Sequence, residues 1–197
     1  MKWRRVLSGL IVVLILGAGS AWAENAQTES IKGRLGITAR VGAISTASSD
    51  SLDPEPSLVV GGGVIFGVTD ILAIEADVVH APDVKFYNTA GKLKTTDVSV
   101  GLQIRNRMDE FTAYLGIGAD ALLIDADNNG TSVDVDTVYG GHIRGGADFF
   151  FTRNVALNVD LRGSFFPPTD LRQEGAKVAT YDPVSFIGTV GIRFFLY

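Results

Sequence analysis

Apolar and polar residues alternate with a period of two in segment after segment of the chain. In DVSVGLQIR, residues 97–105, one face holds valine, leucine and isoleucine, and the other holds aspartate, serine, glutamine and arginine. The same alternation runs through IKGRLGITARVGAI at 31–44 and VALNVDLRGSF at 155–165. Successive side chains of an extended strand point to opposite faces, so this period is typical of strands with one apolar and one polar face.

Eight such segments are predicted, each about ten residues long, the length of a strand that crosses a membrane. Their ranges are 31–44, 57–68, 71–80, 95–106, 111–123, 137–150, 155–166 and 184–196. Long polar connections, such as STASSDSLDPEPS, alternate with short ones, such as FTRN. This layout is typical of outer-membrane barrels, whose periplasmic turns are short. The sequence therefore predicts an all-β fold, an eight-stranded antiparallel up-and-down transmembrane β-barrel.

The orientation of the two faces needs separate evidence, because a soluble, lipocalin-like barrel would show the same alternation inverted. The polar stripes are rich in glycine, as at Gly63, Gly101 and Gly118, which the narrow interior of a small barrel needs beside arginines. Aromatic residues gather at the strand ends, as rings do at membrane interfaces. They are Phe66, Phe111, Phe149, Phe150, Phe151 and Phe194 at one end, and Phe86, Tyr87, Tyr139, Phe165, Phe166 and Phe186 at the other. We therefore expect the apolar face to contact lipid.

The start of the chain has a different character. MKWRR is basic, VLSGLIVVLILGAGS is apolar, and AWA before Glu24 fits a cleavage site of small residues. We interpret residues 1–23 as a secretory signal peptide and residues 24–197 as a single outer-membrane β-barrel domain, with both termini in the periplasm. A transmembrane anchor is the alternative, but the apolar run is short for one.

Net charge and cysteine content limit the classes of binding partner and site that the chain can have. Without Lys2, Arg4 and Arg5 the chain has 14 basic residues against 22 acidic ones, a net charge of −8. This charge argues against nucleic acid as a partner. The chain has no cysteine, which excludes disulfides and thiol metal sites. The expected partners are the lipid and lipopolysaccharide of a Gram-negative-type outer membrane.

The polar stripes of the predicted barrel carry charges of both signs. The side chains expected to line the lumen are Arg34, Arg40, Glu75, Asp77, Asp97, Arg105, Tyr114, Asp120, His142, Arg144, Asp148, Asp160, Arg162 and Arg193, with Lys32 beside them. One interpretation is a charged pore or gate. The other, which we favour, is a plug of mutual ion pairs, because the interior of so small a barrel is only wide enough for side chains to fill it.

The chain offers little for catalysis, and we expect no enzymatic activity. A lipid-modifying barrel needs an activated nucleophile, typically a serine beside a histidine. The two histidines are His80, which has no serine close in sequence although Ser99 could be near in space, and His142, which is expected within the lumen. Pro82 cannot donate to a strand ladder. His80 and Pro82 therefore mark a candidate lateral opening between lumen and lipid.

One predicted loop carries the spacing of a calcium site. In DADNNGTSVDVD, Asp125, Asp127 and Asn129 stand at positions 1, 3 and 5, with glycine at 6 and Asp136 at 12. Aspartate at position 12 has a shorter reach than glutamate, and the loop joins strands rather than helices. Because Asp, Asn and Gly are also the ordinary residues of hairpin loops, an unliganded loop is the favoured interpretation. No other cofactor is expected.

Several stretches together resemble one known family. They are GVIFGVTDILAIEA, TAYLGIGADALL, YGGHIRGGADFFFTRNVALNVDLRGSFF and YDPVSFIGTVGIRF, with HAPDVKF where that family enters its second outer loop. This set, spread over most of residues 31–194, resembles the OmpW family of eight-stranded outer-membrane proteins. The chain departs from the family in adding FLY after Phe194 and in having no tryptophan after the predicted cleavage site.

The resemblance implies a narrow, porin-like channel for transport of small hydrophobic molecules through an apolar-lined lumen. The alternative is a structural or surface-interaction barrel with a closed, ion-paired lumen. The outer half of the lumen distinguishes the two: an apolar funnel there favours transport, and continuous ion pairs favour closure.

Overall fold

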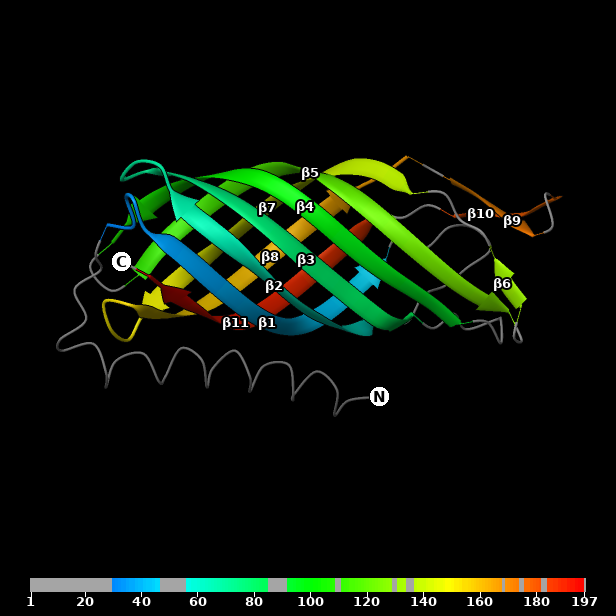
Figure 1. The fold of residues 1–197 in the computed structure, drawn as a ribbon, viewed down its shortest axis with the longest axis horizontal. Helices are drawn as coiled ribbons and strands as arrows, with labels where there is room; N and C mark the ends of the chain where they lie inside the picture. The colour runs from blue at the N-terminus through cyan, green and yellow to red at the C-terminus, as the bar shows by residue number, and fades with distance from the viewer. Residues whose placement is uncertain are drawn as a thin grey trace, which may run out of the picture.

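The computed structural model describes residues 30–46, 56–84, 92–108, 111–128, 131–133, 137–167, 169–173, 176–181 and 184–196. These residues form a closed antiparallel β-barrel (Figure 1). Its eight long strands are β1 (Leu35–Thr46), β2 (Ser57–Gly67), β3 (Leu72–Val84), β4 (Lys92–Arg107), β5 (Phe111–Asn128), β7 (Val138–Phe150), β8 (Val155–Phe165) and β11 (Ser185–Phe195). The predicted fold class is confirmed.

The barrel closes through pairing of its first and last strands. Strand order is β4-β3-β2-β1-β11-β8-β7-β5, and β4 pairs with β5 to complete the circle. Thr38 on β1 stands opposite Arg193 on β11 and, on its other side, opposite Gly63 on β2. Full closure leaves no long strand edge, so the backbone polar groups are paired within the barrel wall, as the hydrocarbon region requires. In the described part of the chain, no helix is long and apolar enough to cross a membrane.

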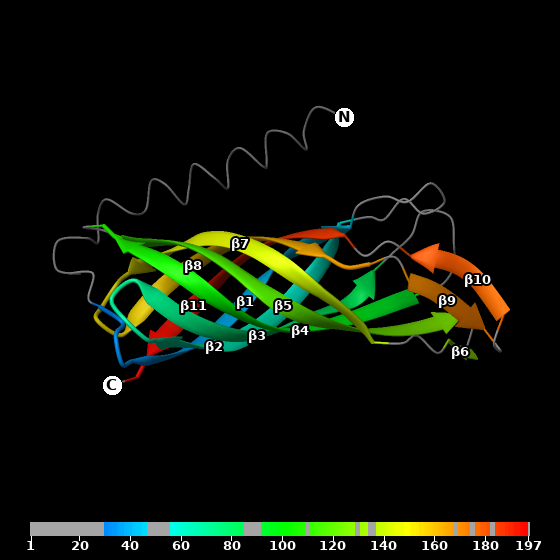
Figure 2. The same ribbon diagram turned by 90° about the horizontal axis from the view of Figure 1, so that it is seen from above.

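The two ends of the barrel differ. Short connections join β2 to β3, β4 to β5 and β7 to β8 at one end, called here the turn end, where β1 begins and β11 finishes (Figure 1). Three short strands, β6 (Thr131–Val133), β9 (Thr169–Gln173) and β10 (Ala176–Tyr181), lie at the opposite loop end, within segments predicted as loops (Figure 2). β6 continues the sheet from β5, and β9 pairs with β10.

Threonine side chains stabilise two of the tight turns. Thr69 Oγ1 accepts hydrogen bonds from the backbone N–H groups of Ile71 and Leu72, at 3.2 and 3.0 Å. Thr152 Oγ1 accepts from Asn154 and Val155 in the same way, at 3.2 and 3.1 Å. A hydroxyl that bonds its own backbone two and three residues on replaces a backbone turn partner, so these short connections need no glycine.

The outward-pointing side chains are apolar. Those of Ile104, Leu115 and Leu161 are 67%, 72% and 69% exposed, and the residues that alternate with them are buried. This exposure would be costly in water and is what contact with lipid hydrocarbon requires. The face assigned to lipid from the sequence is therefore the outer face of the barrel.

The first predicted strand needs a correction. It was expected from residue 31, with Ile31 on the lipid face and Lys32 in the lumen, but β1 begins at Leu35. Gly33 has a positive φ of 73°, and Arg34 N–H donates to Ile31 C=O at 2.9 Å. This turn reverses the alternation, so Ile31 is buried within the turn end and Lys32 is exposed.

Two aromatic assignments also need correction. Phe150 and Phe166 were expected in the membrane-interface girdles, but both are buried inside the barrel. The rings of Phe66, Phe151, Phe165, Phe186, Phe194 and Tyr139 are exposed at the two ends, and those of Phe111 and Phe149 are half-buried, with ring centroids 5.4 Å apart. Phe86 and Tyr87 lie outside the described residues.

Candidate functional site: the barrel interior

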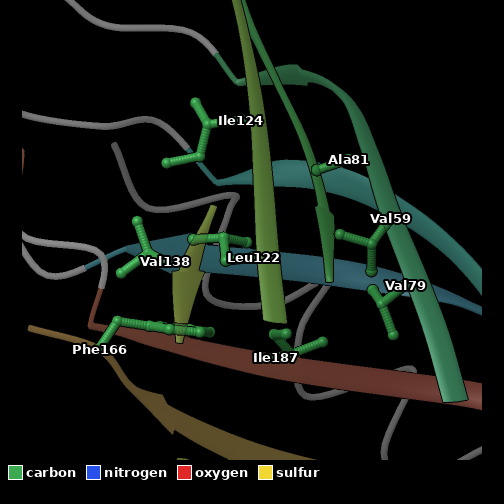
Figure 3. Packing of buried hydrophobic residues seen from close by; sticks show 8 residues of the cluster. All are labelled: Val59, Val79, Ala81, Leu122, Ile124, Val138, Phe166 and Ile187. Atoms are coloured by element: carbon green, nitrogen blue, oxygen red, sulfur yellow. The ribbon is translucent and has the colours of Figure 1, made fainter. Parts of the chain in front are cut away.

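The interior is built in three layers along the barrel axis. At the loop end lies the outer apolar cluster, formed by Val59, Val79, Ala81, Leu122, Ile124, Val138, Phe166 and Ile187 (Figure 3). At the turn end lies the inner apolar cluster, formed by Ile31, Ile65, Ala73, Phe150, Ala156 and Phe195. Between them lie the charged side chains of the polar stripes, called here the ion-pair layer.

The outer apolar cluster encloses a small cavity. Its side chains come from β2, β3, β5, β7 and β11 and from the residue that follows β8 (Figure 3). The cavity has a volume of about 20 Å³, and Thr95, Asp97 and Ser185 line it together with apolar side chains. It is therefore a hollow of mainly apolar wall that touches the ion-pair layer at its inner side.

The outer part of the ion-pair layer is organised by Arg162 on β8. Its Nη2 donates to Asp97 on β4 at 2.7 Å and to Asp120 on β5. His142 Nδ1 lies 2.6 Å from the same Asp120 oxygen. Arg162 also donates from Nη1 to the Ser99 hydroxyl at 3.2 Å and from Nε to the Ser164 hydroxyl at 3.1 Å. One guanidinium thus joins two carboxylates from neighbouring strands.

Glu75 on β3 lies at the centre of the deeper part of the ion-pair layer, the part nearer the turn end. Its Oε1 accepts from Arg40 at 2.8 Å and from Arg193 at 2.7 Å, and its Oε2 lies 3.0 Å from Arg144. Asp77, two residues further along the same strand, is 3.0 Å from Arg40 and also contacts Arg144. Three arginines from three other strands therefore surround two neighbouring carboxylates.

The layer continues toward the turn end through Asp148 and Asp160. Asp148 accepts from Arg193 at 2.7 Å, and it also accepts from Arg105. Asp160 accepts from Arg144 Nε at 3.0 Å and from the Tyr114 hydroxyl at 2.7 Å. The Tyr114 ring lies beneath three guanidinium carbons at 5.3, 6.0 and 5.8 Å, those of Arg105, Arg144 and Arg193. Cation–π contacts of this kind add to the ion pairs in a desolvated site.

The inner apolar cluster ends the interior at the turn end. The rings of Phe150 and Phe195 stack with centroids 5.7 Å apart. Arg34 lies with its guanidinium 5.4 Å above the Phe195 ring. Ile31, which the turn at Gly33 directs inward, completes the cluster. The ion-pair layer is therefore held between two apolar layers.

Interior glycines make room for these side chains. A Cβ at Gly118 would lie 2.4 Å from His142 Cε1, and one at Gly146 would lie 2.5 Å from the Tyr114 hydroxyl oxygen. Neither approach leaves room for a methyl group. Glycine at these two positions is therefore a packing requirement of the ion-pair layer.

All fourteen side chains that the sequence directs into the lumen lie inside the barrel and are buried. Three further side chains, Thr38, Gln103 and Asn158, are also buried and hydrogen-bonded within the layer, although they were not among those predicted to line the lumen. Arg193 Nε donates to Thr38 at 2.8 Å, Arg105 donates to Gln103 at 2.8 Å, and Asn158 donates to Asp148 at 2.8 Å. Their positions on the polar stripes already indicated that they face the lumen, but the predicted lumen residues were mainly the charged ones.

The candidate lateral opening lies near the loop end of β3. His80 Nδ1 is 2.9 Å from Thr96 Oγ1 on β4, on the outer face of the wall. The ladder is regular to the pair Ala81–Thr95 and then shifts register before Val84, across the exposed Pro82. The structure thus has a local irregularity between β3 and β4 at this position.

The calcium prediction falls mostly outside the described residues. Asn129 and Asp136 are not described, and Asp125 and Asp127 belong to β5, where their backbone pairs with β4 rather than forming a loop. No group of three or more histidine, aspartate or glutamate side chains arranged for a metal is present among the residues described.

Comparison with known proteins identifies the architecture. The family model described as outer membrane protein beta-barrel domain matches residues 10–194. Neisserial surface protein A has a similar solved structure, with 15% identity, a TM-score of 0.62 and coverage of 82% of this chain and 95% of that one. The outer membrane protein OprG from Pseudomonas aeruginosa is similar at 14% identity and a TM-score of 0.59, over 86% of this chain and 99% of that one.

A member of the OmpW family, which the sequence resembles, is also similar in structure. The E. coli Outer Membrane Protein W is similar in structure, with 14% identity, a TM-score of 0.51 and coverage of 84% of this chain and all of that one, 100%. At this identity the likeness concerns the fold. A search of curated proteins finds no match.

Proposed function

Because the chain belongs to the family of the outer membrane protein β-barrel domain, a family of the outer membrane, we propose that it is a narrow channel for small hydrophobic molecules. The observation that carries the proposal is the composition of the interior. The outer apolar cluster offers an apolar site at the loop end, whereas the layer beneath it is fully charged and buried. The alternating loop lengths predict that both termini lie in the periplasm, and in that orientation the loop end would face the outside of the cell.

An apolar molecule that entered the outer apolar cluster could not continue along the axis. The ion-pair layer fills the interior with side chains that bond one another, as between Glu75 and Arg193. Passage would separate these ions without offering them other partners, which costs several kcal/mol for each stranded charge, on the order of 3–5. Exit must therefore be sideways, and the register shift across Pro82 between β3 and β4 is the proposed place.

Stapling β3 to β4 tests this exit. His80 and Thr96 are directly opposite in neighbouring antiparallel strands, a separation suited to a disulfide, and the chain has no other cysteine. In His80→Cys/Thr96→Cys protein reconstituted in vesicles, uptake of an apolar fluorescent probe should fall on oxidation and recover on reduction. The matched control is Ala113→Cys/Ala147→Cys, an opposite pair on β5 and β7, for which oxidation should leave uptake unchanged.

A second function is favoured by a different observation. β5 has 18 residues and continues into the hairpin with β6, and β9 and β10 form a second small sheet at the loop end (Figure 2). Ordered strands beyond the barrel wall would suit a structural or surface-interaction barrel with a closed lumen. Absence of probe uptake in both redox states of the stapled protein, and in unmodified protein, would favour this function and contradict the channel.

A further inference from the structure

The outer part of the ion-pair layer has more acidic side chains than arginines, whereas the deeper part has equal numbers of the two. The four deeper acids are Glu75, Asp77, Asp148 and Asp160, and four arginines contact them, namely Arg40, Arg105, Arg144 and Arg193. The outer acids are Asp97 and Asp120, and among the described residues only Arg162 pairs with both. The outer group therefore has two carboxyl groups for one guanidinium, with the His142 ring beside Asp120.

The same two carboxylates have unused hydrogen-bonding capacity. Asp97 Oδ1 and Asp120 Oδ2 are buried atoms that accept no hydrogen bond from the residues the structure describes. Asp97 is only 5% exposed, and its other oxygen is the one that Arg162 contacts. A buried carboxylate oxygen without a donor is costly, so such a group indicates a missing partner.

Asp97 also lines the cavity beneath the outer apolar cluster. Thr95 and Ser185 line the same cavity, so three oxygen-bearing side chains meet its otherwise apolar wall. Its volume of about 20 Å³ has room for about one water-sized group. The cavity thus combines a small polar side, a carboxyl oxygen that lacks a hydrogen-bond donor and apolar surroundings.

We propose that this cavity binds the head group of small amphiphiles that carry one ammonium group on an apolar body. An ammonium is compact, has one positive charge and three N–H donors, and can reach Asp97, Thr95 and Ser185 together. The apolar body would extend from the head group toward the loop end between Leu122, Phe166 and Ile187, and these side chains must move apart to admit it because the cavity itself holds only about one water-sized group. A carboxylate of equal length is excluded because it would meet Asp97 with like charge. The inference rests on the proposed entry of apolar molecules and specifies which of them bind.

The test compares three molecules with the same six-carbon body. Binding of hexylamine, hexanol and hexanoate to the full barrel in lipid nanodiscs is measured at neutral pH by ligand-observed NMR. We expect the amine to bind about tenfold more tightly than the alcohol, the order of a charge-assisted hydrogen bond, and the carboxylate not to bind. In Asp97→Asn the preference for the amine should disappear while hexanol still binds.

Control variants separate loss of the site from loss of the fold. Asp70→Asn makes the same chemical change in the turn between β2 and β3 and should keep the amine preference. Folding of each variant is checked on a denaturing gel, where a folded barrel runs differently in unboiled and boiled samples. If Asp97→Asn does not fold by this gel shift, amine binding is measured instead on Ser185→Ala and Thr95→Val, each of which should weaken it several-fold. Equal binding of amine, alcohol and carboxylate would overturn this inference and leave the channel proposal standing. Binding of none of the three would overturn both.

Discussion

Arg193 on the last strand donates from Nη2 to Glu75 Oε1 on β3 at 2.7 Å, although β1 and β2 lie between these strands in the wall. The bond therefore crosses the interior rather than following the sheet. Both side chains are almost completely buried. It connects β11 to β3 across the lumen, and it is one of the contacts by which side chains fill the interior of the barrel.

Removing Arg193 should destabilise the barrel strongly. Arg193→Ala leaves Glu75 and Asp148 each with one charge partner fewer in a buried site, and the free energy of unfolding should fall by about 3–5 kcal/mol. Urea unfolding in lipid vesicles measures the change. The exposed Arg107 on β4 is the control, and Arg107→Ala should change stability by less than about 0.5 kcal/mol. Equal stability of the two variants would mean that the interior is hydrated.

A methyl group at Gly146 should also destabilise the barrel. The added Cβ would overlap the Tyr114 hydroxyl, which donates to Asp160, so Gly146→Ala should cost about 1–3 kcal/mol. At Gly163 the added Cβ would meet the rings of Phe165 and Phe186 at 3.6 Å, an ordinary contact. Gly163→Ala should therefore retain the thermal midpoint of the gel shift, and a lower midpoint for it than for Gly146→Ala would contradict this packing analysis.

The wild-type barrel should conduct ions poorly. The ion-pair layer spans the interior with buried charges that bond one another, and an interior of this strand number is filled by side chains. In planar bilayers we expect no stable stepwise current of the size seen with water-filled porins. Such steps in purified wild-type protein, absent from protein-free bilayers, would show that the layer opens under these conditions.

The mature chain should begin at Glu24, after cleavage of residues 1–23. Mass spectrometry of protein recovered from the outer-membrane fraction should give the mass of residues 24–197, because a signal peptide of the predicted kind is removed on export. An epitope placed at the C-terminus should resist protease added to intact cells and become sensitive once the outer membrane is permeabilised. Retention of residues 1–23, or cleavage of the epitope in intact cells, would contradict the predicted topology.

The sequence by itself determined the strands and their two faces. Alternation is a local property: once a segment is extended, the side chains at every second position share a face, whatever the segment later pairs with. Thus Asp97 and Arg105 could be assigned to one face of the same strand without knowing their partners. The even number of strands and the alternating loop lengths then favoured a closed barrel over an open sheet.

Alternation is less informative near the ends of the strands, where local turns change the direction of side chains. Gly33 turns the chain just before β1, so the face of Ile31 does not follow from that of Ile37. Periodicity alone does not reveal this change, because a single turn residue shifts the register by one. Phe150 and Phe166 are a different case: their position near strand ends resembles that of girdle residues, but each has the inward parity of the residue two positions before it, Asp148 or Ser164.

The tertiary structure decided which charges meet. Arg162 and Asp97 are separated by 65 residues, and their contact depends on strand order, tilt and the stagger between neighbouring strands. The same geometry places four arginines with four acids in the deeper layer and leaves Asp97 and Asp120 to share Arg162. The six arginines and six acids predicted to line the lumen are equal in number, whereas distances within the closed barrel determine which of them pair, since the attraction between charges weakens with separation.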